Sequence, residues 1–153
     1  MQIEYLADHP GLLTELALLH HEQWGYLRPD KSLEERTEQL RAACGRGGVP
    51  AVVVAVEDGA LCGSAMLIAS DMDVRPDLTP WLAGVYVVAA FRGRGCGSAL
   101  VRRIESEASA LGVPRLYLYT PDAAGFYRRL GWNVEERCEY LGREVVVMSK
   151  SRI

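Results

Sequence analysis

The sequence lacks the paired cysteines that metal and redox sites use. Its four cysteines stand far apart, and no C-x-x-C pair or Cys/His cluster occurs. We therefore expect free thiols and no bound metal. The chain has 153 residues, a length that buries about 68–70% of the surface of the unfolded chain and allows a core without metal or disulfide support. The cysteines are Cys44, Cys62, Cys96 and Cys138.

Long apolar runs are also missing. No stretch approaches the roughly 20 apolar residues of a membrane-spanning helix. The N-terminus lacks the basic region and apolar run of a secretory signal. We therefore expect a soluble, cytoplasmic protein. Because no internal repeat or linker interrupts the pattern, the sequence predicts a single domain over residues 1–153.

Neither sign of charge dominates the chain, whose net charge is −3, and this disfavours nucleic-acid binding. The two halves differ, however. Residues 1–80 hold 6 Lys/Arg and 13 Asp/Glu, which gives −7, whereas residues 81–153 hold 11 and 7, which gives +4. We expect an anionic ligand in the basic half and a cationic partner drawn to the acidic half.

Three alternating glycines mark the junction between an apolar run, residues 81–91, and a helical pattern. The segment is Arg92-Gly93-Arg94-Gly95-Cys96-Gly97-Ser98. Glycines leave backbone N–H groups accessible, and a helix that begins here adds unpaired amides and a positive dipole end, so the segment suits a pyrophosphate. A P-loop ending is absent, and Ser98 replaces the third glycine of the dinucleotide fingerprint. A purely structural strand-to-helix turn is the alternative.

The spacing also matches R/Q-x-x-G-x-G/A, with Arg92, Gly95 and Gly97 behind a predicted strand at residues 85–87. This pattern resembles the GNAT superfamily of acetyl-CoA-dependent N-acetyltransferases. The resemblance implies that the amides of residues 93–98 bind the coenzyme A pyrophosphate and that the strand pairs with the pantetheine arm. The implied cofactor-binding residues are Val85, Tyr86, Val87, Arg92, Gly93, Arg94, Gly95, Cys96, Gly97, Ser98, Thr120 and Tyr127.

A second motif strengthens the resemblance. Residues 125–132, Gly-Phe-Tyr-Arg-Arg-Leu-Gly-Trp, match F/Y-Y-x-x-x-G-F/W, whose tyrosine approaches the cofactor sulfur in the family. The implied catalytic groups are the Tyr127 hydroxyl, which faces the leaving thiolate, and the Val87 backbone N–H, which stabilises charge on the carbonyl oxygen. Because tyrosine (pKa ~10) is a weaker acid than a thiol (~8.5), full proton transfer to the thiolate needs a tuned pKa, and hydrogen bonding alone is the other possibility. A Tyr127 hydroxyl in solvent is the alternative.

The order of predicted elements is that of the GNAT fold. We expect a mixed α/β (α+β) protein, a three-layer αβα sandwich with a central, mostly antiparallel sheet and a parallel central strand pair splayed at the cofactor site. Asp8 is available to cap the first helix, Ser32 and Glu35 form a capping box for the second, and Thr120 and Pro121 begin the fourth. The expected helices are 10–24, 32–44, the segment after the glycine loop up to Gly112, and 120–130; the expected strands are 51–56, 60–69, 81–88, 115–119, 132–140 and 143–149.

Large and soft side chains near these motifs are expected to pack in the core. Cys96 at a helix N-terminus is either a reactive thiol or a small hydrophobe, and we favour the latter. We expect the same packing role for the three tryptophans. They are Trp24, Trp81 and Trp132.

The sequence departs from the family pattern at three places. Ala89 replaces a common proline, Thr120 replaces a cofactor-contacting asparagine, and the strand at 115–119 has no acid, so no general base is named. The candidates for steering an amine or ordering a water are three acids in the loop before residue 81, with a solvated acidic loop as the alternative. These acids are Asp71, Asp73 and Asp77. Adjacent His20 and His21 also lie near this side, but neighbouring helix residues do not share a face, which disfavours a shared metal.

The sequence therefore predicts an enzyme that moves an acetyl group from acetyl-CoA to a primary amine of a cationic acceptor by direct attack. A non-catalytic acyl-CoA-binding or sensor module and nucleotide binding by the glycine loop remain alternatives. Small amines, antibiotic amines, polyamines, protein N-termini and lysines all stay open as acceptors. The expected partners are acetyl-CoA and the amine, without nucleic acid or membrane, in a monomer or homodimer.

Overall fold

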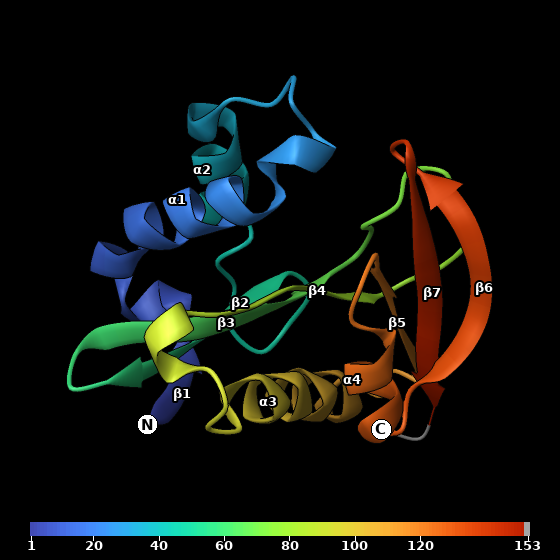
Figure 1. The fold of residues 1–153 in the computed structure, drawn as a ribbon. Helices are drawn as coiled ribbons and strands as arrows, with labels where there is room; N and C mark the ends of the chain where they lie inside the picture. The colour runs from blue at the N-terminus through green and yellow to red at the C-terminus, as the bar shows by residue number, and fades with distance from the viewer. Residues whose placement is uncertain (152–153) are drawn as a thin grey trace.

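A seven-stranded sheet lies between two layers of helices in the computed structural model, which describes residues 1–151 (Figure 1). Helices α1 (Leu13–Trp24) and α2 (Leu33–Ala42) cover one face. Helices α3 (Cys96–Ala110) and α4 (Ala124–Arg129) cover the other. The expected three-layer αβα sandwich is confirmed.

The strands follow the order β1-β2-β3-β4-β5-β7-β6, and only β4 and β5 run parallel. Their parallel ladder has a single pair of partners, Trp81 opposite Tyr117, next to a hydrogen bond from the Tyr117 N–H to the Pro80 carbonyl at 3.1 Å. Beyond that pair the two strands diverge, which confirms the splayed central pair. The bounds are β1 Gln2–Tyr5, β2 Ala51–Glu57, β3 Ala60–Ile68, β4 Trp81–Val87, β5 Arg115–Thr120, β6 Asn133–Tyr140 and β7 Arg143–Ser151.

Apolar stripes attach the helices to the sheet. In α1 the buried positions are 13, 16, 17 and 20, the spacing of one helical face. In α3 the buried stripe runs from Cys96 to Ala108 and packs with β5 and Trp132 in the largest cluster. A second cluster lies between β2 and α1, and a third surrounds Trp81. The apolar core thus lies on both faces of the sheet and anchors β4 at its Trp81 end.

The predicted helix cap and the predicted hairpin turn are both present. Ser32 Oγ accepts a hydrogen bond from the Glu35 N–H at 3.1 Å, and the Glu35 carboxylate accepts one from the Ser32 N–H at 3.2 Å, so the capping box of α2 is confirmed. The β2–β3 turn places Asp58 at φ +51° and Gly59 at φ +79°. Two consecutive positive φ angles are typical of a tight hairpin turn, as predicted.

Two local predictions were wrong, and one strand was missed. Strand β1 was not predicted, because a four-residue segment gives too short a pattern. Asp8 does not cap α1; a 3₁₀ turn at Pro10–Leu12 precedes the helix, and the Asp8 carboxylate pairs instead with Arg46 Nε at 2.8 Å. Pro121 lies before α4 rather than within it, because the Thr120 hydroxyl accepts from the Ala123 N–H at 3.0 Å and delays the helix to Ala124.

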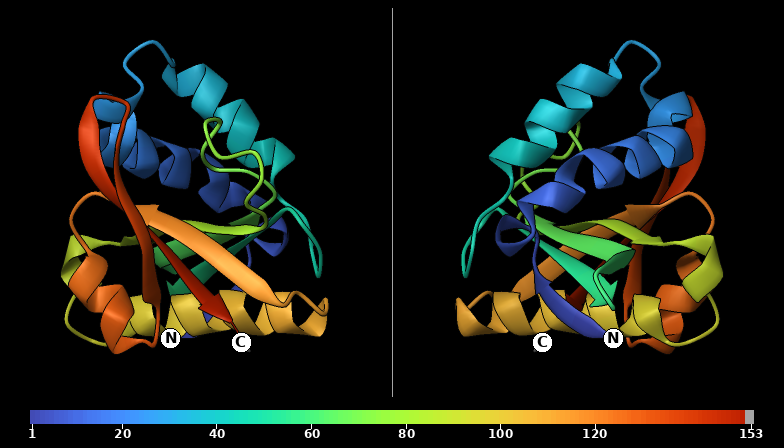
Figure 2. Two further views of the ribbon diagram at one scale, coloured as in Figure 1. Left: turned by 90° about the vertical axis from the view of Figure 1, so that its right-hand side faces the viewer. Right: turned by 90° about the vertical axis from the view of Figure 1, so that its left-hand side faces the viewer.

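The β6–β7 hairpin extends beyond the sheet toward the α1–α2 connection (Figure 2). Arg28 Nη2 donates to the Tyr140 hydroxyl at 3.0 Å, and the Arg143 guanidinium lies 4.4 Å from the centre of the Tyr26 ring. These contacts join the first and last parts of the chain on one side of the molecule. Among residues 1–151, no helix is both long enough and apolar enough to cross a membrane.

Candidate active site

Strand β4 has a β-bulge at the point where the candidate site lies. Ser64 lies opposite Tyr86 and Met66 lies opposite Ala83, so β4 holds one extra residue at Gly84 and Val85. Gly84 has φ +59°, and a Cβ there would lie 2.7 Å from Met66 Sδ. Only glycine fits this position without displacement. The bulge bends β4 where it separates from β5, a common arrangement beside active sites.

A buried hydrogen-bond chain holds the bulge. Ser64 Oγ donates to the Gly84 carbonyl at 2.8 Å and lies 2.9 Å from His20 Nε2. Because the hydroxyl has only one proton, His20 Nε2 must be the donor to Ser64. Burial, followed by the positive charge of Arg36, lowers the pKa of His20 to about 4. His20 is therefore neutral at physiological pH and acts as a positioning residue for β4. His21 points elsewhere and lies 3.4 Å from Arg36 Nε.

The backbone of β4 offers donors to the opening beside it. The Val88 N–H donates to the Cys62 carbonyl on β3 at 2.8 Å. Because N–H groups alternate along a strand, the Val87 N–H points away from β3 and toward the space that β5 has left. Arg92 Nε donates to the Val87 carbonyl at 3.0 Å, and the guanidinium lies 5.9 Å from the Tyr86 ring centre. The Arg92 side chain thus lies along β4.

The glycine loop leaves its backbone uncovered. Gly93 and Gly95 both have φ +79°, and a Cβ on either would meet no atom within 4 Å. Gly95 is the N-cap of α3, so the first amides of α3 have no carbonyl four residues earlier within the helix to bond. A Cβ on Gly97 would lie 3.4 Å from Phe126 Cζ and 3.5 Å from Val87 Cγ2. The loop therefore combines open amides and a helix N-terminus beside β4, the features of an anion site.

Cys96 and Arg94 complete this segment. Cys96 is buried, and burial raises the pKa of its thiol, so it packs as the expected small hydrophobe. Arg94 is exposed, stacks 5.5 Å from the Phe91 ring centre and lies 3.9 Å from the Glu57 carboxylate. Arg94 is therefore only loosely paired.

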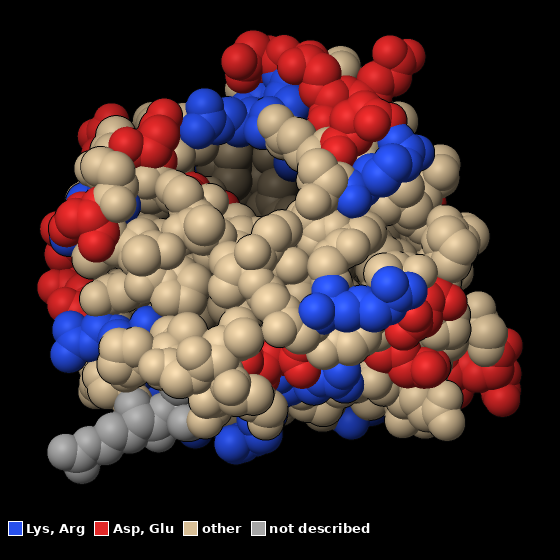
Figure 3. Space-filling model, turned by 180° about the vertical axis from the view of Figure 1, so that it is seen from behind, with Lys and Arg blue, Asp and Glu red and all other residues tan. Residues whose placement is uncertain are grey.

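A cavity of about 620 Å³ lies where β4 and β5 diverge, and it is lined from α1 and α2 on one face of the sheet and from Tyr127 of α4 on the other. Residues 82–85 of β4 and 118–120 of β5 line it, together with α1, α2, their connection and the β6–β7 turn. Figure 3 shows the hollow on the face behind that of Figure 1, with Lys and Arg side chains on its rim. Its volume suits a small ligand.

Tyr127 lines this cavity from α4. Its side chain is 8% exposed and lies edge-on to Phe126 and Trp132, with ring centres 5.0 and 6.2 Å away. No hydrogen bond joins its hydroxyl to another of residues 1–151. Burial, followed by the negative charge of Asp122, raises the pKa of Tyr127 well above its usual value. The hydroxyl thus stays protonated and is available to donate to a ligand.

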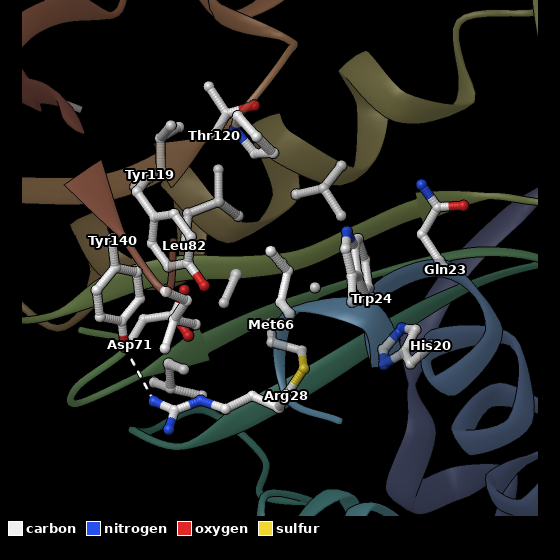
Figure 4. Close-up of a pocket in the computed structure, with 18 of the residues that line it drawn as sticks. His20, Gln23, Trp24, Arg28, Met66, Asp71, Leu82, Tyr119, Thr120 and Tyr140 are labelled. Carbon is white, nitrogen blue, oxygen red and sulfur yellow. Dashed lines mark hydrogen bonds between the residues drawn. The ribbon is translucent and has the colours of Figure 1, made fainter. Parts of the chain in front are cut away.

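The three candidate acids lie in different places. Asp71 lines the cavity beside Tyr119 (Figure 4), and burial raises its pKa to about 7 against the opposing charges of Lys31 and Arg28. Asp73 also lines the cavity, where it accepts from the Tyr140 hydroxyl at 3.2 Å and lies 3.8 Å from Arg28 Nη2. Asp77 is exposed, pairs with Arg75 and does not line the cavity. The structure therefore brings together Asp71 and Asp73 without Asp77.

Four further cavity residues were not predicted as site residues. Trp24 was expected to pack, but it is only half-buried, lies 5.0 Å from the His20 ring centre and lines the cavity. Arg28, Lys31 and Arg36 also line it. No local motif marks these residues, because only the packing of α1, α2 and their connection over the sheet directs them inward. Trp81 and Trp132 are buried, as expected.

A metal site is not apparent. Within residues 1–151, no group of three His, Cys, Asp or Glu side chains is arranged to hold a metal ion.

Comparisons with known proteins agree on one family. The sequence model of the acetyltransferase (GNAT) family matches residues 13–132. No curated protein sequence matches the chain significantly. Similar solved structures include an aminoglycoside 6'-N-acetyltransferase complexed with coenzyme A, with 18% identity, 100% of this chain and 98% of that chain covered and a TM-score of 0.80.

Two further structures illustrate the range of relatives. The aminoglycoside 6'-N-acetyltransferase from Enterococcus faecium is 19% identical over 100% of this chain and 98% of that chain, with a TM-score of 0.77. The ribosomal-protein-alanine N-acetyltransferase from Brucella melitensis is 24% identical over 99% of each chain, with a TM-score of 0.70. At these identities the likenesses show the fold.

Proposed function

Because the chain belongs to the GNAT family of acetyltransferases, we propose that it moves an acetyl group from acetyl-CoA to the primary amine of a cationic acceptor by direct attack. The observation that carries this proposal is the position of β4. Residues 82–85 of β4 line the charged cavity, while the Val87 side chain lies beside Gly97, where an added Cβ would be 3.5 Å from Val87 Cγ2. One strand thus joins an anion site on one side of the sheet gap to a small-molecule cavity on the other.

The residues present fit acetyl-CoA. Residues 93–98 would hold its pyrophosphate, because the open amides at Gly93 and Gly95 and the N-terminus of α3 all favour a phosphate. The backbone of residues 85–87 would pair with the pantetheine arm in the space that β5 has left. When bound, the cofactor supplies an activated acetyl thioester. Arg92, Arg94, Cys96, Ser98 and Thr120 complete the proposed cofactor-binding set.

Two groups of the chain act on the reacting atoms in this proposal. The Val87 N–H would donate to the carbonyl oxygen as negative charge develops there. The Tyr127 hydroxyl would donate to the sulfur as it leaves. Since the raised pKa of Tyr127 keeps this hydroxyl protonated, a hydrogen bond rather than full proton transfer is its expected contribution.

The acceptor amine would bind in the cavity beside Asp71. An ionised Asp71 carboxylate attracts a protonated amine, and a pKa of about 7 leaves it ionised in part at neutral pH. The amine attacks as the free base, so it releases its extra proton to water before the attack. Asp73 already has two partners, Tyr140 and Arg28, so its expected role is to hold this wall of the cavity. Asp77 is the third acid that the sequence suggests for steering the amine, but it lies outside the cavity, so we propose no direct contact between Asp77 and the acceptor.

Purified protein, acetyl-CoA and a panel of amines test the proposal. Release of free thiol together with an acetylated amine identified by mass spectrometry is the expected result. Binding of acetyl-CoA without any product would instead support the non-catalytic acyl-CoA module. A melting-temperature rise as large with NAD or ATP as with acetyl-CoA would support the nucleotide alternative. A cytoplasmic location and the assembly state, monomer or homodimer, stay predictions.

A further inference from the structure

Three cationic side chains gather at one end of the cavity. Arg28 and Lys31 come from the α1–α2 connection, and Arg36 comes from α2. Arg28 has an acidic partner, Asp73, at 3.8 Å. The other two have neutral partners: Lys31 Nζ donates to Gln39 Oε1 at 2.9 Å, and Arg36 Nε lies 3.4 Å from His21 Nδ1. Two positive charges of this cluster therefore lack a carboxylate within ion-pair distance in residues 1–151.

The cluster is electrostatically unsatisfied. Burial and then the positive charges of Arg36 and Arg28 lower the pKa of Lys31, and burial also lowers the pKa of Arg36. Arg36 Nη2 is buried and has no hydrogen-bond partner among the described residues. A buried donor of a charged group is expensive to leave unpaired, and like charges close together repel. An anion in the cavity would offset the repulsion among the positive charges of Arg28, Lys31 and Arg36.

The anion of this cluster is not the phosphate of the cofactor. Helix α2 covers the face of the sheet opposite to α3, whose N-terminus carries the glycine loop (Figure 1). The cluster instead shares a cavity with Asp71, whose carboxyl responds to the charges of Lys31 and Arg28. Opposite charges therefore face one ligand space of about 620 Å³.

We propose that Arg36 and Lys31 form an anion subsite, and that the acceptor is a small amine that carries its own carboxylate or phosphate. This inference rests on the proposed acetyl transfer, but it limits the positive charge of the acceptor to the ammonium group, which an anionic group of the same molecule balances. The amine binds beside Asp71, and the anionic group bonds to the guanidinium of Arg36 and to the ammonium group of Lys31, two residues that line the cavity. The planar guanidinium suits both oxygen groups, since each accepts two parallel hydrogen bonds. A polyamine would bring a positive charge to the same place and be rejected.

Matched acceptor pairs test the subsite. An amino acid is compared with its carboxamide, and phosphoethanolamine with ethanolamine, at fixed pH and ionic strength. We expect the anionic member to have the higher kcat/KM by about 10- to 100-fold, mainly through KM, because one charged hydrogen bond is gained. The pair that shows the larger preference identifies carboxylate or phosphate. Equal values, or preference for the neutral member in both pairs, would overturn the inference.

Variants locate the effect. In Arg36→Gln and in Lys31→Gln, the ratio of kcat/KM for the anionic acceptor to kcat/KM for its neutral counterpart should fall toward one. Arg41→Gln is the matched control, because Arg41 is an exposed residue of α2 that pairs with Glu38 and does not line the cavity. Lys31→Gln changes a residue outside the regular helices, so it keeps the test valid if Arg36→Gln does not fold. An unchanged preference in a folded Lys31→Gln or Arg36→Gln protein would overturn the assignment.

A binding measurement separates this inference from the proposed function. Inorganic phosphate and succinate should raise the melting temperature of the wild-type protein and of Arg41→Gln, but much less that of Arg36→Gln. If no amine is acetylated but this Arg36-dependent shift occurs, the proposed function fails and the anion subsite stands. If amines are acetylated but no anion gives an Arg36-dependent shift, the anion subsite fails and the proposed function stands.

Discussion

Replacing Ser64 with alanine should weaken the support of the β4 bulge. Ser64 is fully buried, and its hydroxyl joins His20 Nε2 to the Gly84 carbonyl. Alanine fits the space, because it removes one oxygen and adds nothing. The substitution leaves two buried polar groups, the His20 N–H and the Gly84 carbonyl, without their partner.

The expected loss of stability follows from these two groups. Each unpaired buried donor or acceptor costs about 1–3 kcal/mol. Because His20 and Gly84 line the cavity, water can reach this wall and replace part of the lost bonding. We therefore expect a loss toward the lower end of the summed range, about 2–3 kcal/mol. At roughly 2–4 °C per kcal/mol for a domain of this size, the melting temperature should fall by about 4–12 °C.

Urea and thermal unfolding of Ser64→Ala and of a control, Ser109→Ala, measure this effect. Ser109 is exposed on α3, where a serine-to-alanine change should alter stability by about 0.5 kcal/mol or less. The kcat/KM for acetyl-CoA should also fall in Ser64→Ala, since the bulge orients the Val87 N–H. A loss no greater than that of Ser109→Ala would refute the hydrogen-bond chain.

The remaining predictions concern the acceptor, the glycine loop and the tyrosine. Because the pKa of Asp71 in the folded protein is raised to about 7, kcat/KM for the acceptor should rise with pH through that value. The stability that the protonated carboxyl contributes should be lost as pH rises from about 4 to 7. A pH–rate profile that Asp71→Asn leaves unchanged would contradict this prediction. Gly97→Val places a branched side chain against Phe126. It should weaken the free energy of acetyl-CoA binding by more than it lowers the free energy of unfolding, whereas Gly11→Val, in open space, should leave the Kd for acetyl-CoA unaltered. Tyr127→Phe should lower kcat by up to ~100-fold, at the modest end of general-acid effects, with little change in the Kd for acetyl-CoA; an unaltered kcat would remove the hydroxyl from the reaction.

Local chemistry explains which parts of the fold could be predicted. The capping box at Ser32 and the Asp58-Gly59 turn depend on residues next to one another in the chain, and both are present as expected. Asp8 failed as a cap because Pro10 starts a separate 3₁₀ turn and Arg46, far along the chain, attracts the carboxylate. The residues next to an exposed acid in the sequence do not reveal which distant residue it will pair with in the folded protein.

The same distinction separates the two sides of the site. The open amides at Gly93 and Gly95 follow from glycine spacing, so the sequence locates them. A cationic acceptor was predicted from the net charge of −7 over residues 1–80, yet three basic residues of that acidic half line the cavity: Arg28, Lys31 and Arg36. The net charge of a segment does not depend on where its charged side chains point, and only the packing of the fold decides which of them face a cavity.

The single pair of partners between β4 and β5 gives this protein a sheet edge in its interior. Exposed edges ordinarily invite pairing with other chains. Here the bare donors of β4 lie inside the molecule, between β3 and β5 and above α3 and α4. The halves β1–β4 and β5–β7 of the one sheet are joined only by the pair Trp81 and Tyr117. An elongated ligand in the opening would act as a missing strand and slow amide hydrogen exchange at Val85 and Val87.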